Sequence, residues 1–327
     1  MRVLVTGGAG FLGSALVRAL VERGDAVRVL DALTYAGRRE HLEGLEVELQ
    51  VGDVRDPSAC QRALAGVEVV VHCAAETHVD RSLRDPLLFV RTNVEGTQVL
   101  LKEAASAGVE RFHHVSTDEV YGSLAAGEGA WAPTAPLRPR NPYAASKAAA
   151  DHLVWAAANG YGLPVSMHRA ANTFGPRQWP EKLVPLFIER ALRGESLPVY
   201  GDGRQVRDWL YVEDHARAVL EMLALPAGSL WHVAGGLQVE NLDLVARLCA
   251  ALGVAPRIDH VADREGHDRR YDLDDSAFRA ASGWAPRVGL DEGLRRTVAW
   301  TLEHRELLGR ITGGDAFRSW VSAQYGG

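Results

Sequence analysis

Mostly apolar runs alternate with helical stretches through the first half of the chain. The runs that we assign to strands are 2–6, 27–30, 47–51, 68–72, 111–115 and 165–169. The stretches whose apolar residues recur at helical spacing include 14–23, 86–107 and 143–159. Because strands that alternate with helices form a parallel sheet covered on both faces, this pattern predicts an α/β fold with a doubly wound sheet of the Rossmann type.

The alternation stops at Asn172–Pro176, and a region of different composition follows. Its expected elements are a strand and turn at 197–203, a strand at 207–212, and amphipathic helices at 241–252 and 290–304. The tail from Gly313 is expected to be loosely ordered. We therefore predict a cofactor-binding Rossmann domain over 1–173, to which 207–233 returns, and a smaller α/β substrate-binding lobe over 174–327.

Length, charge and cysteine use narrow the classes of function. With 327 residues the chain can form one large or two modest cores, and its net charge of -6 opposes binding to nucleic acid. The three cysteines lack metal-ligand spacing, so we expect buried thiols and no metal site. The first residues enter a strand directly, and no apolar run approaches membrane-spanning length. We therefore expect a soluble, cytoplasmic protein with no membrane partner.

Three glycines stand directly after the first strand, at the start of the first helical stretch. Strand, glycine turn and helix follow one another in the order of a dinucleotide-binding fold. There Gly7 allows the tight turn, Gly10 lets the backbone approach a pyrophosphate, and Gly13 lets the helix pack on the strand. Phe11 and Leu12 lie between them, where the helix amino end faces the phosphate charge. Such turns also occur without ligands, so the glycines need a second signal.

That second signal is an aspartate at the end of the second strand. Asp31 lies about eighteen residues after the last glycine, where a carboxylate can accept both ribose hydroxyls and would repel a 2′-phosphate. The cofactor is therefore expected to be NAD. Arg38 and Arg39 keep NADP open as the alternative, because a guanidinium near the ribose is how such folds accept a 2′-phosphate. Otherwise both arginines are solvated.

Further cofactor contacts are expected at the other strand ends and in the neighbouring helix. These candidates are Leu33, Thr34, Asp53, Val54, Ala74, Ala75, Thr92, Val115 and Ser116. Asp53 is placed to reach the adenine edge, with a helix cap before Pro57 as the alternative. Thr92 and Asn93 interrupt a helix face that should be apolar, which favours a buried hydrogen-bond network.

The stretch Ser116–Gly122 contains the densest group of reactive side chains. Because it follows the run 111–115, Thr117, Asp118 and Glu119 should lie at the mouth of a parallel strand, where open α/β sheets bind ligands. Two adjacent carboxylates provide an acid and a base for one substrate if their environments separate their pKa values. We therefore expect these three side chains to be catalytic.

A tyrosine and a lysine open the helix that follows. A spacing of four residues places Tyr143 and Lys147 on one helix face. A lysine ammonium beside a phenol is expected to lower the phenol pKa from about 10, so that the phenolate can take a hydroxyl proton while hydride leaves the same carbon. The alternative is a surface tyrosine beside a surface lysine. The presence of the glycine turn and of Asp31 in the same chain favours the catalytic interpretation.

These features together resemble the extended short-chain dehydrogenase/reductase family, and within it the enzymes that dehydrate nucleotide sugars. The segments that carry the resemblance are 33–37, 78–82, 116–122, 180–183, 197–203, 207–215 and 266–271. They are long, specific and in order, and they cover nearly the whole chain. The chain departs from the family where Thr173 and Phe174 follow Asn172, a place where the family often has Asn and Tyr.

The resemblance implies an enzyme that uses NAD to convert a nucleotide-diphosphate sugar, dTDP-glucose, into a 4-keto-6-deoxy sugar and water. Tyr143 would take the C4 hydroxyl proton, and Thr117 would hydrogen-bond the C4 oxygen. Glu119 would remove the C5 proton, and Asp118 would protonate the departing C6 hydroxyl. The substrate-binding residues that it implies are His78, Asn172, Lys182, Leu183, Pro198, Tyr200, Arg207, Asn241, Arg264, His267 and Tyr271.

Several alternatives stay open at this point. A UDP-glucose dehydratase or a UDP-sugar 4-epimerase belongs to the same family, although epimerases usually have small or neutral residues in place of Asp118 and Glu119. A non-catalytic NAD sensor would need neither these carboxylates nor Tyr143. His78 alone is more often a structural histidine, and 264–271 alone is more often a solvated loop. The resemblance also implies a homodimer in which 86–107 and 143–159 form a four-helix interface.

Overall fold

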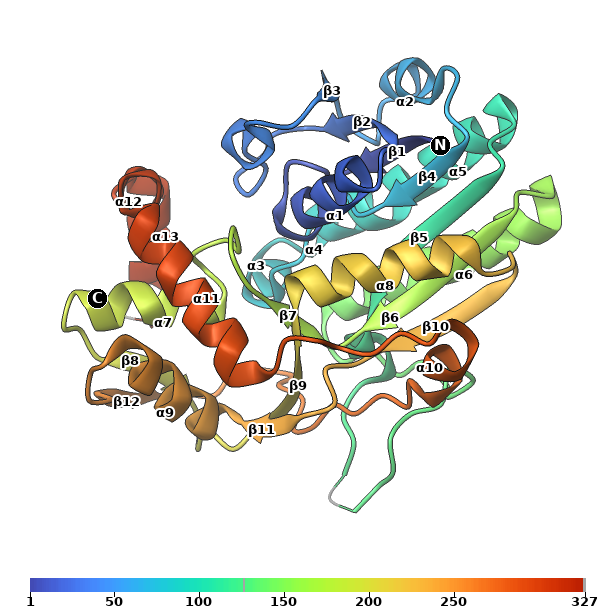
Figure 1. The fold of residues 1–327 in the computed structure, drawn as a ribbon. Coiled ribbons are helices and arrows are strands. Elements are labelled where there is room, and N and C mark those ends of the chain that lie inside the picture. Colours follow the sequence, from blue (N-terminus) through green and yellow to red (C-terminus); the bar gives the residue numbers. More distant parts are fainter. Residues whose placement is uncertain (126, 326–327) are drawn as a thin grey trace.

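A seven-stranded parallel sheet forms the larger part of the molecule, in a computed structural model that describes residues 1–125 and 127–325 (Figure 1). The strand order is β10-β6-β5-β4-β1-β2-β3. Its strands are β1 (Arg2–Thr6), β2 (Ala26–Asp31), β3 (Val47–Val51), β4 (Val69–His72), β5 (Arg111–Thr117), β6 (Val165–Ala170) and β10 (Ser229–Val233). The predicted Rossmann-type fold is confirmed.

Helices cover both faces of this sheet. They are α1 (Phe11–Glu22), α2 (Pro57–Leu64), α3 (Val79–Arg84), α4 (Pro86–Phe89), α5 (Gly96–Ala107), α6 (Pro142–Tyr161) and α8 (Val212–Ala224). Leu16 of α1 packs with Val219 of α8 on one face, and Leu100 of α5 packs with Ala157 of α6 on the other. Successive residues of β1 point to opposite clusters, as a strand buried on both sides requires.

The helical stretch predicted over 86–107 is continuous but not uniform. Between α4 and α5 lies a π-helical segment, Val90–Glu95. Asn93 of this segment is buried, and its side chain exchanges hydrogen bonds with the main chain of Glu76, at 2.8 and 2.9 Å. It also donates to Ser146 of α6 at 2.8 Å. The buried network that we favoured for this position is confirmed.

The smaller part contains two further sheets and several helices. A three-stranded sheet has the order β11-β9-β7, and a two-stranded sheet pairs β12 with β8. The bounds are β7 (Asn172–Phe174), β8 (Leu197–Tyr200), β9 (Val206–Tyr211), β11 (Gln238–Glu240), β12 (Ile258–Val261), α7 (Leu183–Leu192), α9 (Asn241–Leu252) and α11 (Leu290–Glu303). The helix α10 (Ser276–Ser282) packs beside β10 of the large sheet. We expected 207–233 to return to the first domain. In the structure β10 joins the large sheet, and β9 pairs with β7 and β11.

The C-terminal region corrects one expectation. After α12 (Arg305–Thr312), the chain forms α13 (Asp315–Tyr325) where we expected a loosely ordered tail from Gly313. Phe317 and Trp320 are buried, so α13 has an apolar face that packs on the rest of the protein. Residues 326–327 of the predicted tail lie outside the described residues. Throughout the described part of the chain, each helix is too short or too polar to cross a lipid bilayer.

Candidate active site

A cavity of about 440 Å³ lies where the carboxyl ends of the large-sheet strands meet the smaller sheets. This is the place where ligands bind to open α/β sheets. The predicted site residues that line it are Gly7, Gly10, Phe11, Leu12, Gly13, Asp31, Thr34, Asp53, Val54, Ala74, Ala75, His78, Thr92, Ser116, Thr117, Asp118, Glu119, Tyr143, Asn172, Lys182, Leu183, Pro198, Tyr200, Arg207, Asn241, Arg264 and His267. Cofactor and substrate candidates therefore share one cavity.

Four predicted residues are not among those that line the cavity. Leu33 and Val115 pack into the apolar cluster beneath α1. Lys147 is buried and donates from Nζ to the main-chain oxygen of Val115 at 2.7 Å. Tyr271 is buried, and its hydroxyl donates to Asp268 at 2.7 Å. The ligand contacts expected of these four residues stay predictions.

The glycine turn forms a cradle that only glycine permits. Gly7 has a φ of 68°, and a Cβ placed on it would lie 2.7 Å from the main-chain nitrogen of Ala74. A Cβ on Gly13 would lie 2.1 Å from the carbonyl oxygen of Gly7. Gly10 precedes α1 without a side-chain cap, so the first N–H groups of the helix stay available for an anion. The turn fits the pyrophosphate of a dinucleotide.

Asp31 closes the other end of this cradle. Its carboxylate accepts the main-chain N–H of Ala9 at 2.9 Å and that of Leu33 at 2.8 Å. Burial raises the pKa of Asp31, and these two hydrogen bonds oppose the change. A carboxylate has about four acceptor sites, so Asp31 keeps capacity for two ribose hydroxyls. The residues present therefore fit NAD.

Two alternatives for this region are settled by the contacts. Asp53 does not cap α2, because Asp56 is the cap and accepts the N–H of Ser58 at 2.9 Å. Asp53 instead lines the cavity and pairs with Arg55 at 2.6 Å. The guanidinium carbon of Arg38 lies 5.2 Å from the ring centre of Trp179, so Arg38 packs on an aromatic ring and is not simply solvated.

Replacing Gly13 by Ala is expected to lower the affinity for NAD by about tenfold or more, since α1 must shift away from the Gly7 carbonyl to admit the new methyl group. Titration of the quenching of protein fluorescence by NAD measures the affinity. Gly129→Ala is the matched control, because a Cβ there meets no atom within 4 Å. Equal affinities for the two variants would contradict the cradle.

The reactive stretch lies at the carboxyl end of β5, as the sequence predicts, although the strand is two residues longer than expected. β5 continues to Thr117, and Asp118–Tyr121 forms a 3₁₀ turn. Thr117 caps this turn, because its hydroxyl accepts the N–H of Glu119 at 3.3 Å and donates to Asp118 at 3.2 Å. The cap aims both carboxylates into the cavity.

The two neighbouring carboxyls differ in environment. Asp118 is buried, and burial together with the charge of Glu119 raises its pKa well above the usual value. Burial also raises the pKa of Glu119, but Arg264 and Lys182 oppose the change. Asp118 is therefore the better proton donor and Glu119 the better acceptor. This separation is what paired acid and base catalysis requires.

Tyr143 and Lys147 do not interact as the sequence suggested. Burial raises the pKa of Tyr143, and the charge of Glu119 raises it further. The ammonium of Lys147 contacts Nε2 of His114 at 3.2 Å and the carbonyl of Val115, so it is engaged beneath the cavity. Burial lowers the pKa of Lys147 to about 8, against the charge of Asp151. These contacts and pKa directions therefore do not show the lowering of the Tyr143 pKa by Lys147 that we expected.

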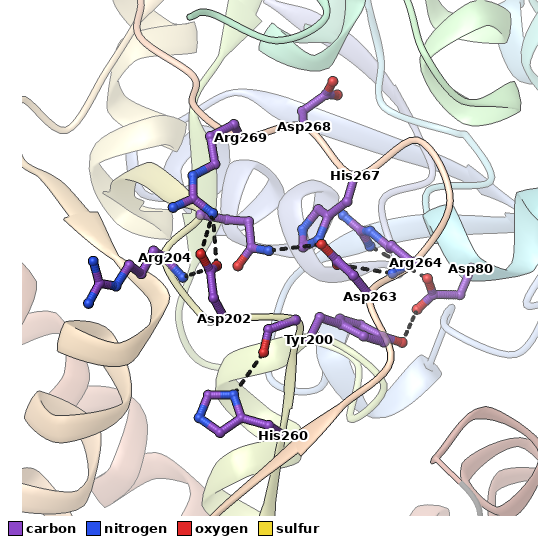
Figure 2. A network of polar contacts seen from close by, with 12 residues as sticks. Asp80, Tyr200, Asp202, Arg204, His260, Asp263, Arg264, His267, Asp268 and Arg269 are labelled. Atoms are coloured by element: carbon purple, nitrogen blue, oxygen red, sulfur yellow. Dashed lines mark hydrogen bonds and ion pairs between the residues drawn. The ribbon is translucent and has the colours of Figure 1, made fainter. Parts of the chain in front are cut away.

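A network of polar contacts surrounds the part of the cavity formed by the smaller sheets (Figure 2). The Arg264 guanidinium lies 3.5 Å from the carboxylate of Asp80, and the Tyr200 hydroxyl donates to the same carboxylate at 3.2 Å. His267 contacts Asp263 at 2.6 Å. Arg264 and His267 face the cavity, so 264–271 is not simply a solvated loop.

Arg207 lies behind this network. It is buried, its guanidinium donates to the main-chain oxygen of Asp268 at 2.8 Å, and it lies 4.1 Å from the ring centre of Tyr271. Several buried polar atoms here have no hydrogen-bond partner within the described residues, which is typical of a site that binds a polar ligand. They are Asp80 Oδ1, Asn172 Oδ1, Asn241 Oδ1, Arg264 Nε and His78 Nδ1.

His78 combines both of the roles that we weighed. Its Nε2 contacts the main-chain oxygen of Glu181 at 3.1 Å, and its ring meets Trp320 edge to face at 5.1 Å. Burial lowers its pKa well below the usual value, so the ring is neutral. These contacts fix it as a structural histidine that also borders the cavity.

The predicted site leaves out twelve polar or aromatic residues of the cavity lining. They are Arg55, Glu76, Thr77, Asp80, Thr173, Gln178, Trp179, Glu181, Phe187, Trp209, His215 and Tyr325. Tyr325 lies on α13, where we expected no regular structure. His215 contacts Thr173 at 3.0 Å and ends a buried chain that continues to His168 at 2.7 Å and on to His113 at 2.8 Å. No local motif marks such a chain, because its members come from separate strands and a helix.

Comparison with known proteins agrees with this geometry. Residues 3–234 match the NAD dependent epimerase/dehydratase family. A dTDP-glucose 4,6-dehydratase of Streptomyces niveus is 45% identical over 317 residues, with 93% of this chain and 94% of the relative covered. The crystal structure of DesIV, a dTDP-glucose 4,6-dehydratase of Streptomyces venezuelae with NAD bound, superposes with a TM-score of 0.92 at 46% identity and covers 95% of this chain and 100% of its own.

An epimerase shares the same architecture. The UDP-glucose 4-epimerase of Thermus thermophilus, also in complex with NAD, has a TM-score of 0.87 at 37% identity and covers 92% of this chain and 98% of its own. The fold alone does not separate the two activities. The glycine cradle, the shared cavity and these matches together show that the chain belongs to the NAD dependent epimerase/dehydratase family.

Proposed function

We propose that this protein is an NAD-dependent dTDP-glucose 4,6-dehydratase, a hydro-lyase that forms dTDP-4-keto-6-deoxyglucose and water. The observation that carries the proposal is the pair Asp118 and Glu119, which face one cavity with unequal pKa shifts. An epimerase has no need of an acid and a base for elimination. The names of the relatives with 40 to 46% identity support the same activity.

The first step is oxidation at C4 of the sugar. Tyr143 takes the C4 hydroxyl proton, and the hydroxyl of Thr117 holds the C4 oxygen. NAD, when bound, supplies the hydride acceptor for C4 and the hydride donor for C6, and its oxidised ring adds a positive charge that favours ionisation of the Tyr143 phenol. Lys147 orients this region from below through the carbonyl of Val115.

The second step is loss of water between C5 and C6. A keto group at C4 acidifies the C5 hydrogen, which Glu119 removes as the base. Asp118 gives its proton to the departing C6 hydroxyl, as its raised pKa allows. As hydride arrives at C6, Glu119 returns its proton to C5. Asp118, which gave its proton to the departing water, regains one from Tyr143, which holds the proton of the C4 hydroxyl, so all three side chains return to their starting states. The cofactor ends in the form in which it began.

The diphosphate is assigned to the cationic side of the cavity. Lys182, Arg207 and Arg264 supply positive charge there, and guanidinium groups bind phosphates through paired hydrogen bonds. Asn172 and Asn241 offer the polar atoms that lack partners within the described chain. Leu183, Pro198 and Tyr200 border the remaining space, and we assign the thymine ring to this group.

The purified protein is expected to convert dTDP-glucose to a 4-keto-6-deoxy sugar without added reductant. The keto product absorbs in the ultraviolet after addition of alkali, whereas the product of a 4-epimerase does not. Parallel assays with UDP-glucose compare catalytic efficiency on the two nucleotides. Formation of a UDP-galactose-type product, or no reaction with either sugar, would contradict the proposal.

We also propose a homodimer through the helical stretches 86–107 and 143–159. Leu87 is 62% exposed, and Leu83 and Val90 beside it are also exposed, an arrangement that favours contact with a second copy. Replacing Leu87 by Asp is expected to give monomers in analytical ultracentrifugation. Leu302→Asp, at an exposed position of α11, is the control and should leave the dimer intact. A monomeric parent protein would exclude this assembly.

The cytoplasmic location stays a prediction.

A further inference from the structure

Three segments that are far apart in the sequence interlock beside the cofactor cradle. The segment after β2 contributes Tyr35, whose pKa is raised by burial and by the charge of nearby Glu76. The Arg81 guanidinium lies 4.1 Å from the Tyr35 ring centre. Arg81 also forms a two-pronged ion pair with Glu181, from the segment that precedes α7.

The same interlock reaches back to the glycine turn. Trp179 meets the Tyr35 ring edge to face at 5.6 Å, and the guanidinium of Arg38 lies over the Trp179 ring. The main-chain N–H of Arg38 donates to the carbonyl of Ala9, within the turn, at 3.0 Å. We call Tyr35, Arg38, Glu76, Arg81, Trp179 and Glu181 the clasp. It joins the turn of the first domain to the first segment of the substrate lobe.

Burial makes the clasp more than a surface ion pair. The Glu181 side chain is 1% exposed, and the Arg81 side chain is 30% exposed. Glu76, Trp179 and Glu181 line the cavity, so the clasp forms part of the wall around a bound ligand. Exposed pairs contribute little, whereas loss of one partner from a buried pair leaves an uncompensated charge. Opening the clasp therefore requires the Arg81–Glu181 ion pair to separate, which costs free energy.

The proposed reaction requires the cofactor to stay bound through the whole catalytic cycle. The hydride that leaves C4 must return to C6 of the same sugar, so release of the reduced cofactor in mid-cycle would leave a keto sugar that cannot be completed. A site for an exchanging cofactor needs an open path to solvent. A site for a retained cofactor needs a barrier, and the clasp stands between the glycine turn and the substrate lobe.

We propose that the clasp retains the cofactor, with Arg81 and Glu181 as positioning residues that slow its release. The need to retain the cofactor rests on the proposed function, but the rate of NAD release can be measured without any sugar substrate. Breaking the ion pair accelerates dissociation of NAD without removing any group from the reacting atoms.

The test measures dissociation of NAD without substrate. Each protein is loaded with radiolabelled NAD, freed of excess by gel filtration, and chased with unlabelled NAD. Glu181→Gln is expected to accelerate release by about tenfold or more, and Arg81→Lys, which keeps the charge but loses the paired geometry, by a smaller factor. Arg247→Gln is the matched control, because Arg247 pairs with Asp243 and Asp291 outside the cavity lining.

The outcomes separate the two proposals. Release from a folded Glu181→Gln protein at the parental rate would overturn the clasp, and Arg81→Lys decides the matter if Glu181→Gln does not fold. Faster release from Arg247→Gln would likewise overturn it, because the effect would not be specific. A parent protein that holds NAD but does not dehydrate dTDP-glucose would refute the proposed function alone. With substrate, the Glu181→Gln protein is expected to need added NAD for sustained turnover.

Discussion

Replacing Glu119 by Gln is expected to lower the turnover of dTDP-glucose by about 10²- to 10⁴-fold, the range typical for loss of a general base. The amide keeps the shape of the side chain but cannot take the C5 proton. Oxidation at C4 does not depend on that proton transfer, so the reduced cofactor should accumulate when sugar is added. Its near-ultraviolet absorbance, followed by stopped flow, separates the two steps.

Glu110→Gln is the matched control for this experiment. Glu110 is exposed beside the amino end of β5, far along the strand from the reactive stretch, and its loss should leave turnover unchanged. Asp118→Asn provides a second comparison, since it removes the proposed acid and leaves the base. Normal turnover by the Glu119→Gln protein would exclude Glu119 as the base.

Acidification below pH 6.5 is expected to destabilise the fold strongly. Of the twelve histidines, nine have a lowered pKa, chiefly through burial: His41, His72, His78, His113, His114, His168, His215, His232 and His267. Each stays neutral in the fold but takes up a proton in the unfolded chain as pH falls. Their stabilising effect is therefore complete above pH 6.5 and is lost as pH falls toward 4.

Buried carboxyls act in the opposite direction but are fewer. The pKa is raised for six of them, including Asp208, where burial raises it to about 6. Because the histidines with a lowered pKa outnumber the carboxyls with a raised pKa, the free energy of unfolding should fall as pH falls below 6.5. A lower Tm at pH 5.5 than at pH 6.5 is expected in scanning calorimetry.

Single histidine variants test whether the buried histidines cause the dependence of Tm on pH. His232 is buried on β10, and burial lowers its pKa to about 4. His232→Gln should make Tm less dependent on pH, because one of the nine buried histidines no longer contributes. His152→Gln, at an exposed position of α6, should leave the dependence as it is. A Tm at pH 5.5 that equals or exceeds the Tm at pH 7.5 would contradict the assignment.

The strand and glycine patterns predicted the first domain well, because they report local physics. The runs that became β1, β3 and α9 match within a residue, since apolar periodicity and glycine geometry are set by neighbours in the chain. The same locality placed Asp118 and Glu119 at the end of β5. What the sequence could not provide was the partner of each side chain across the fold.

Tyr143 and Lys147 illustrate that limit. Their spacing of four residues correctly places both on one face of α6, but it does not reveal that the lysine is occupied by Val115 and His114. The clasp is a clearer case, because Tyr35, Arg81 and Glu181 lie in three separate segments. Contacts of this kind depend on the packing of the two lobes and carry no local signature.

The helix that replaced the expected tail has a practical meaning for anyone who handles this protein. Gln324 of α13 donates to the hydroxyl of Tyr200 at 2.7 Å, and Tyr325 borders the cavity. The final helical turn is thus part of the cavity wall, on the side that we propose for the nucleotide. Affinity tags, reporter fusions or proteolytic trimming at that end of the chain are therefore expected to weaken substrate binding, and the opposite terminus is the better place to attach them.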